Sequence, residues 1–240
     1  MAPTRSRRIL RVSWLGLGAG FSMGGGRNAR TNSRRSDALA TDGMFFLVTG
    51  ASGVGKSTIR QLIEPEFAGV LEAAELAMLG DTPEWNLAWR HRMVDQMVRH
   101  ALDVQRGGKH FLFCGDPVPP GEVWAAPSAH QLNHLAVCLL DASEGAQTAR
   151  LVARGEDLSF IRHHVAFAEW MRRHVLDHTY RPEVITQNAW PGMCWERWVG
   201  SAAGQPPWAS YVIDTSAQSP AEVAHLVAQW LYSYIGKPAG

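Results

Sequence analysis

The stretch Gly50-Ala51-Ser52-Gly53-Val54-Gly55-Lys56-Ser57 fits the pattern G-x-x-x-x-G-K-[ST] that is typical of phosphate-binding loops. The residues before it, 44–49, are apolar enough for a buried strand, and those after it, 58–63, are compatible with a helix. The glycines let the backbone turn so that successive N–H groups point at phosphate oxygens. The helix that follows adds the positive end of its dipole. The stretch therefore predicts a loop that binds phosphate.

Each part of this loop has an expected role in holding ATP and Mg²⁺. Lys56 would reach the β- and γ-phosphates, and the Ser57 hydroxyl would bind Mg²⁺. Such a pattern arises by chance in about one chain in a hundred of this length, and the flanking strand and helix reduce those odds further. The expected nucleotide-binding residues are Gly50, Ala51, Ser52, Gly53, Val54, Gly55, Lys56, Ser57 and Thr58.

The composition is that of one globular α/β domain, or of one domain with an insertion. The chain has 240 residues, of which 46% are hydrophobic, and its net charge of +1 predicts no strongly electrostatic partner. The three widely spaced cysteines favour reduced thiols in a cytoplasmic protein over disulfides or a zinc site. No apolar run approaches eighteen residues, so we expect no membrane span.

Residues 1–43 differ from the rest of the chain. Three interpretations are open: a targeting peptide, a basic arm for nucleic acid, or a disordered extension that lies upstream of the natural start at Met44. We favour the disordered extension, because the apolar stretch 14–17 is short for a signal and is broken by glycine. The segment holds two acids, Asp37 and Asp42, and eight arginines, at positions 5, 7, 8, 11, 27, 30, 34 and 35.

Beyond the loop, apolar runs alternate with segments that have helical periodicity. Because the runs are continuous, they favour a doubly wound, mainly parallel sheet of five strands with helices on both faces, the fold of P-loop NTPases. Predicted helices cover 84–106, 144–154 and 159–178, and a last helix begins with a capping box at Ser219. The predicted strands are 44–49, 69–72, 110–114, 135–140 and 211–214.

The segment 184–208 reads as an irregular but ordered insertion in the 44–240 domain. It is rich in proline and glycine and carries four tryptophans. We expect these tryptophans to fill a core beneath a long loop, with a ligand cage as the alternative. They are Trp190, Trp195, Trp198 and Trp208.

Several motifs of other phosphate-loop proteins are absent from the sequence. No strand ends in the paired acids of oligomeric ATPases, no Asn-Lys-x-Asp run is present for guanine, and no Leu-Ser-Gly-Gly-Gln run is present. These absences count against a motor, a GTPase switch and a transporter ATPase.

The phosphate loop and the segments after the fourth and fifth predicted strands resemble those of the nucleoside-monophosphate-kinase-like group of P-loop kinases. This group includes shikimate, gluconate and chloramphenicol kinases. The resemblance covers about residues 44–236 and rests on 50–57, on Arg150-Leu151-x-x-Arg154, and on 212–216. Only the phosphate loop is specific by itself, and no subfamily follows. The resemblance implies that 144–178 is a mobile lid whose arginines close on the phosphate, and that the loop after the fifth strand lies near the adenine.

Phosphoryl transfer requires positioned reactants and neutralised negative charge. Lys56, Arg150 and Arg154 are the expected catalytic cations, although the two arginines would also fit a solvated helix face. A hydroxyl acceptor needs a carboxylate to take its proton. Glu72 and Asp116 are the candidates, because both lie at the carboxyl ends of predicted strands, and Asp116 is also a candidate Mg²⁺ ligand.

Other polar residues have weaker functional signals. Asp141 also follows a strand, where we expect it to cap a helix. Arg90 and Arg92 lie with Trp85 and Trp89 in the part of the chain that closes over the acceptor in similar kinases, which would suit an anionic substrate with a ring. A helix with apolar and solvated faces is the alternative.

One histidine pair also has metal-ligand spacing. His174 and His178 lie four apart, yet no third ligand is evident, so a surface helix is favoured over a metal site.

The sequence thus predicts an ATP- and Mg²⁺-dependent kinase, a cytoplasmic monomer or homodimer without nucleic-acid or membrane partners. Its acceptor would be a nucleoside or nucleotide, a sugar acid, or a hydroxylated natural product such as an antibiotic. One alternative is a regulatory ATPase that contacts a protein through 184–208. A nucleic-acid 5′-kinase is a third hypothesis, and it would need the arginines of 1–43.

Overall fold

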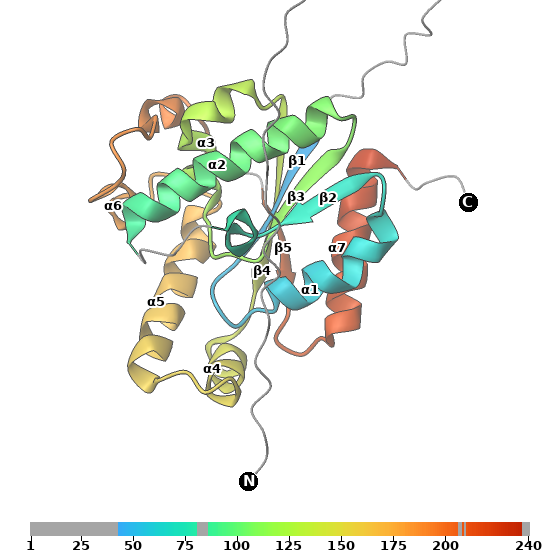
Figure 1. The fold of residues 1–240 in the computed structure, drawn as a ribbon. Coiled ribbons are helices and arrows are strands. Elements are labelled where there is room, and N and C mark those ends of the chain that lie inside the picture. Colours follow the sequence, from blue (N-terminus) through green and yellow to red (C-terminus); the bar gives the residue numbers. More distant parts are fainter. Residues whose placement is uncertain (1–42, 81–85, 206–207, 209, 237–240) are drawn as a thin grey trace, which may run out of the picture. The chain divides into compact units, whose positions relative to one another are not determined.

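The structure, a computed structural model, describes residues 43–80, 86–205, 208 and 210–236, and Figure 1 shows their arrangement. The predicted extension 1–43 falls outside these residues except for Gly43, and so does Trp85. Among the described helices, none combines the length and apolar character needed to cross a membrane.

Five parallel strands form one sheet in the order β2-β3-β1-β4-β5. The central strand β1 pairs with β3 through Phe45 and Phe111, and with β4 through Phe45 and Leu135. The predicted doubly wound α/β fold with its parallel five-stranded sheet is confirmed. The strands are β1 (Met44–Thr49), β2 (Leu71–Ala74), β3 (His110–Cys114), β4 (His134–Asp141) and β5 (Ser210–Asp214).

Helices cover both faces of the sheet (Figure 1). Phe46 and Val48 of β1 pack in one core with α1 and α7, while Phe45 and Leu47 pack in a second core with α2 and α3. Alternate residues of a strand point to opposite faces, which explains the continuous apolar runs. The helices are α1 (Lys56–Ile63), α2 (Leu87–Arg106), α3 (Pro120–Ala125), α4 (Glu144–Ala153), α5 (Leu158–His174), α6 (Glu183–Thr186) and α7 (Pro220–Ile235).

Local signals explain where several helices begin. The Asn86 side chain accepts a hydrogen bond from Trp89 N–H and so caps α2. The capping box predicted for the last helix is present, with reciprocal bonds between Ser219 and Glu222. Helix α3 was not predicted, because its short turn begins in the proline-rich loop after β3.

The insertion contains α6 and a 3₁₀ turn, Trp195–Trp198. Trp198 and Trp208 are buried in a third core with Trp170 and Met171 of α5. This packing supports the predicted role of the insertion's tryptophans as core residues. The bounds of the lid and of the insertion as separate units stay predictions.

Candidate active site

The phosphate loop lies between β1 and α1, as its sequence context predicts. Gly50 has φ 146° and Gly55 has φ 101°, values that L side chains rarely adopt. A Cβ atom at Gly50 would lie 2.2 Å from the carbonyl oxygen of Leu140, so β4 leaves no room for a side chain there. The two glycines let the loop pass close to β4 and then turn into α1.

Lys56 is folded back onto its own loop. Its Nζ atom donates hydrogen bonds to the carbonyl oxygens of Gly50 and Ala51, both at 2.8 Å. Burial lowers the pKa of Lys56 to about 8. A buried ammonium held by carbonyl groups alone is ready to gain an anionic partner.

Glu75, which the sequence analysis missed, lies beside the phosphate loop. The Ser57 hydroxyl donates to Glu75 Oε2 at 3.1 Å, and Arg60 Nη2 donates to Glu75 Oε1 at 3.3 Å. Arg60 Nη1 also bonds Glu64 at 3.0 Å, so the guanidinium is held from two sides. A carboxylate and a hydroxyl oxygen in contact are suitable ligands for Mg²⁺.

Glu72 occupies a different place from the one predicted. The second strand forms two residues later than expected, because a 3₁₀ turn at Glu64–Phe67 and the left-handed Gly69 delay its pairing with β3. Glu72 therefore lies within β2, where its Oε1 atom is 2.7 Å from His100 Nε2 on α2. The prediction that Glu72 ends the strand is wrong, and its catalytic role stays untested. The run Ala73-Ala74 before Glu75 was the missed signal.

Asp116 follows β3, as predicted, and comes close to the segment after β2. Its Oδ2 atom accepts a hydrogen bond from Leu76 N–H at 2.6 Å. Burial raises the pKa of Asp116 above its ordinary value, although the hydrogen bond from Leu76 opposes that shift. A raised pKa suits a group that takes a proton from a hydroxyl.

The two predicted lid arginines have different surroundings. Arg150 bonds the loop after β5, with Nη1 2.9 Å from Thr215 Oγ1 and Nη2 donating to the Thr215 carbonyl oxygen. Arg154 is half exposed and pairs with Glu156 at 2.8 Å. Helix α4 is also tied to the phosphate loop, because Gln147 Nε2 donates to the Ser52 carbonyl oxygen at 2.8 Å. Both arginines line the pocket above the loop.

Three adjoining pockets run along the edge of the sheet at the carboxyl ends of its strands, and we name them the base, phosphate and acceptor pockets after the ligand groups that the sequence analysis expects there. The base pocket, of about 370 Å³, shares Gly55, Thr58 and Arg150 with the phosphate pocket, of about 300 Å³. The phosphate pocket shares Pro117 with the acceptor pocket, of about 420 Å³. Shared walls mean that one ligand can extend from the first pocket into the second, with another ligand beside it in the third.

Each pocket has its own lining. The base pocket is lined by Val54, Gly55, Thr58, Ile59, Arg150, Thr215, Gln218, Pro220 and Val223. The phosphate pocket is lined by Ser52, Gly53, Gly55, Lys56, Ser57, Thr58, Gly115, Pro117, Arg150 and Arg154. The acceptor pocket is lined by Leu76, Asn86, Leu87, Trp89, Arg90, Asp116, Pro117, Phe167 and Val184.

Two other predictions about polar residues are wrong. Asp141 does not cap a helix: Ser143 caps α4, while Asp141 Oδ2 accepts from Arg172 Nε at 2.7 Å. His174 is not on a surface helix face, because it is buried and stacks on Trp170 with ring centroids 4.4 Å apart. No cluster of three potential metal-ligating residues occurs in the described part of the chain.

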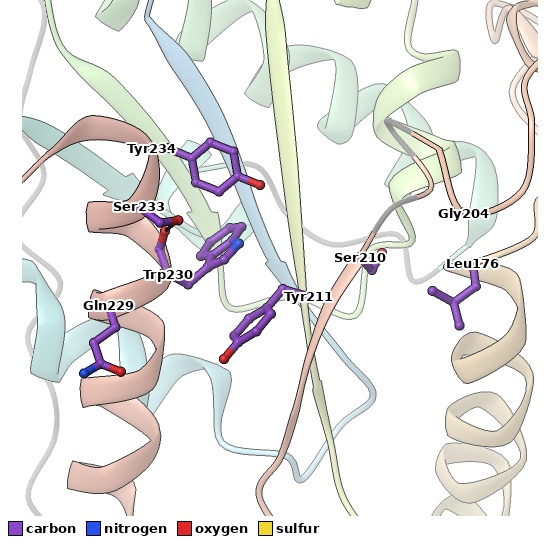
Figure 2. Close-up of a pocket in the computed structure, with 8 residues that line it drawn as sticks. All are labelled: Leu176, Gly204, Ser210, Tyr211, Gln229, Trp230, Ser233 and Tyr234. Carbon is purple, nitrogen blue, oxygen red and sulfur yellow. Dashed lines mark hydrogen bonds between the residues drawn. The ribbon is translucent and has the colours of Figure 1, made fainter.

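A larger groove, of about 650 Å³, lies elsewhere, between β5 and α7 (Figure 2). It lies near the start of β5, whereas the phosphate loop lies at the carboxyl ends of the strands. Its two serine hydroxyls already donate to backbone carbonyl groups, Ser210 to Val175 and Ser233 to Trp230. Its size therefore does not make it the better candidate for an active site, since none of the described residues that line it is charged.

No protein-family model and no curated protein matches the chain. Among solved structures, it is similar to one described as a sugar kinase from Janibacter sp. HTCC2649, with 17% identity and a TM-score of 0.48 over 79% of this chain and 94% of that one. It is also similar to the APS kinase CysC of Mycobacterium tuberculosis in complex with AMPPNP and APS, with 17% identity and a TM-score of 0.44 over 79% and 98% of the two chains. Both likenesses are weak. Both neighbours are described as kinases, and they identify no subfamily.

Proposed function

We propose that the chain is an ATP- and Mg²⁺-dependent kinase that transfers a phosphoryl group to a hydroxyl of a small molecule. The observation that carries this proposal is the row of three adjoining pockets with the phosphate loop in the middle. A nucleotide that fills the first two pockets would bring its terminal phosphate to the border of the third. Such alignment of donor and acceptor is the main requirement of phosphoryl transfer.

The phosphate pocket has the groups needed to hold a polyphosphate. The loop N–H groups and the start of α1 favour anions, and Lys56, Arg150 and Arg154 are positively charged. On nucleotide binding, Lys56 Nζ would exchange its two carbonyl partners for phosphate oxygens. The arginines would balance the negative charge that spreads over the transferred group.

The residues around Ser57 fit a bound Mg²⁺ ion. Ser57 Oγ and Glu75 Oε2 are oxygen ligands in contact, and Arg60 fixes the orientation of the Glu75 carboxylate. When bound, the ion would neutralise phosphate charge. We assign Ser57 to its coordination, with Glu75 as a direct ligand or through water.

Asp116 is the proposed base for the acceptor hydroxyl. It lines the acceptor pocket next to Pro117, which borders the phosphate pocket. The hydroxyl oxygen would attack the γ-phosphorus, the bond from that phosphorus to the bridging oxygen would break, and the proton would pass to Asp116. ADP and the phosphorylated acceptor would then leave.

The experiment is a phosphoryl-transfer assay with the full chain, ATP, Mg²⁺ and a panel of nucleosides, sugars, sugar acids and hydroxylated natural products. We expect one class of acceptor to gain phosphate and to raise ATP turnover above its basal rate. Lys56→Ala is the inactive reference, and Lys109→Ala, at an exposed position, is the matched control. Tight ATP binding without transfer to any acceptor would contradict the proposal.

The alternative function, a regulatory ATPase that contacts a protein partner, has little support from the surface of 184–208. It needed exposed apolar residues in 184–208 to contact a partner, but Trp198 and Trp208 are buried. Of the described large apolar side chains in that segment, Val199 is the exposed one. We therefore propose the kinase alone.

A further inference from the structure

We infer that the acceptor is an uncharged compound that carries a ring and a hydroxyl group, and not a nucleotide or a sugar acid. This inference rests on the proposed function and narrows it. It follows from the walls of the acceptor pocket, from its charges, and from the contrast with the phosphate pocket beside it.

The walls of the acceptor pocket are mainly apolar. They come from the segment after β2, the start of α2, the loop after β3, and helices α5 and α6. A volume of about 420 Å³ lies within the range of small-molecule sites. Aromatic and aliphatic walls stabilise a ring by removing its apolar surface from water. The apolar lining residues are Leu76, Leu87, Trp89, Pro117, Phe167 and Val184.

The one cation among the described lining residues is already neutralised. Arg90 forms a fork onto Glu122, with Nε 3.0 Å from Oε2 and Nη2 donating to Oε1. The Glu122 side chain is wholly buried, and His91 Nε2 lies 3.4 Å from its Oε1 atom. An anionic ligand would have to compete with this carboxylate for the guanidinium, and a bidentate pair of this kind is strong.

The ionisation of Glu122 is maintained inside the protein. Burial alone would raise the pKa of this carboxyl group, but the charge of Arg90 and the nearby His91 ring outweigh burial and lower the pKa. Glu122 therefore stays a carboxylate at neutral pH and keeps Arg90 paired.

Asp116 adds a negative group to the same pocket. Counting Arg90, Glu122 and Asp116 with their usual charges, the described surroundings of the acceptor carry one positive and two negative charges. A phosphate or carboxylate on the acceptor would meet Asp116 without an unpaired cation among the described lining residues. An uncharged hydroxyl compound would instead donate its hydrogen bond to Asp116.

The phosphate pocket shows the opposite arrangement. Lys56, Arg150 and Arg154 line it, and none of its described lining residues is a carboxylate. The groups that favour anions thus lie in the pocket that receives the donor's phosphates. A phosphate on the acceptor would bind in that pocket and not in the acceptor pocket, on the other side of Pro117. On this inference Arg90 does not bind an anionic group of the acceptor, the role that the sequence analysis considered for it together with Arg92.

The test compares matched pairs that differ in charge, with the full chain loaded with Mg²⁺ and AMPPNP. The pairs are uridine and uridine 5′-monophosphate, glucose and gluconate, and 4-hydroxyphenethyl alcohol and 4-hydroxyphenylacetate. Affinity is measured by calorimetry. For each pair of which either member binds, we expect the neutral compound to have an affinity about tenfold or more higher than that of the anionic compound.

Tighter binding of the anionic members would overturn the inference and leave the kinase proposal intact. Absence of binding by all six compounds, while AMPPNP binds, would also count against the inference. Failure to bind AMPPNP would instead contradict the proposed function, so the two failures are distinguishable.

Two variants test whether the carboxylates of Glu122 and Asp116 cause this preference for neutral compounds. Glu122→Gln removes the carboxylate that occupies Arg90 and should shift the ratio of affinities about tenfold toward the anionic member. Asp116→Asn should shift it in the same direction without touching the buried pair, and it serves if Glu122→Gln does not fold. Glu66→Gln, at an exposed position, is the control. An unchanged ratio in the folded variants would overturn the inference.

Discussion

The phosphate pocket and the acceptor pocket are neighbours with opposite characters. The first is lined by loop backbone and by three cations. The second is lined by apolar side chains, and its arginine is paired with a buried carboxylate. Both pockets contain arginine, so residue type alone does not distinguish them. The difference shows that the partner of a charged side chain, and not its presence, decides what a pocket can bind.

The largest expected effect comes from removing Lys56, the buried cation of the phosphate pocket. We expect Lys56→Ala to lower kcat/KM for phosphoryl transfer by about 10²–10³-fold, because a preorganised charge at the transferred group is lost. Steady-state kinetics with the best acceptor measures this loss of kcat/KM. A loss under tenfold, with Lys109→Ala at wild-type activity, would show that the loop is not the reactive centre.

The buried pair of the acceptor pocket should matter for stability. Arg90→Met leaves Glu122 buried and without its main partner, so we expect the free energy of unfolding to fall by about 3 kcal/mol. Chemical denaturation measures this change. Arg154→Met removes a half-exposed arginine and should change the free energy by less than about 0.5 kcal/mol. Equal effects of the two substitutions would contradict the contrast between the pockets.

The Mg²⁺ requirement separates Glu75 from Glu72. Because Glu75 contacts Ser57, we expect Glu75→Gln to raise the Mg²⁺ concentration for half-maximal activity by about 10–100-fold. Glu72→Gln is the matched control, since Glu72 pairs with His100 within the sheet region. Titration of activity with Mg²⁺ gives both values. A larger shift for Glu72→Gln than for Glu75→Gln would contradict the assignment of Glu75 to the Mg²⁺ site.

The smallest expected effect is that of pH on the affinity for AMPPNP. Since burial lowers the pKa of Lys56 to about 8, the free protein loses this positive charge as the pH rises through that value. Phosphates favour the charged form, so AMPPNP should bind about tenfold more weakly at pH 9 than at pH 7. Calorimetry at several pH values measures the change. Lys56→Met should bind weakly throughout with a flatter profile, and an equally steep profile would assign the pH dependence to another group.

Much of the fold was predictable because its signals are local. The bounds of β1 and β3 were predicted residue for residue, and the capping box at Ser219 and Glu222 was found as expected. The end of β2 was missed by two residues, which moved the expected acid from Glu75 to Glu72. A strand rises about 3.3 Å per residue, so an error of two residues moves a side chain about 7 Å along the sheet and changes which acid lies at the carboxyl end of β2.

The sequence by itself determined the phosphate loop, the parallel sheet and the expectation of a kinase, because short-range pattern and backbone geometry are encoded in neighbouring residues. Only the tertiary structure decided which charges meet. Ser57 contacts Glu75, and Arg90 contacts Glu122, 32 positions away. Such contacts arise when separate elements pack together, and no spacing rule relates their members. The charge of each pocket, and with it the acceptor, therefore depends on packing that no single segment encodes.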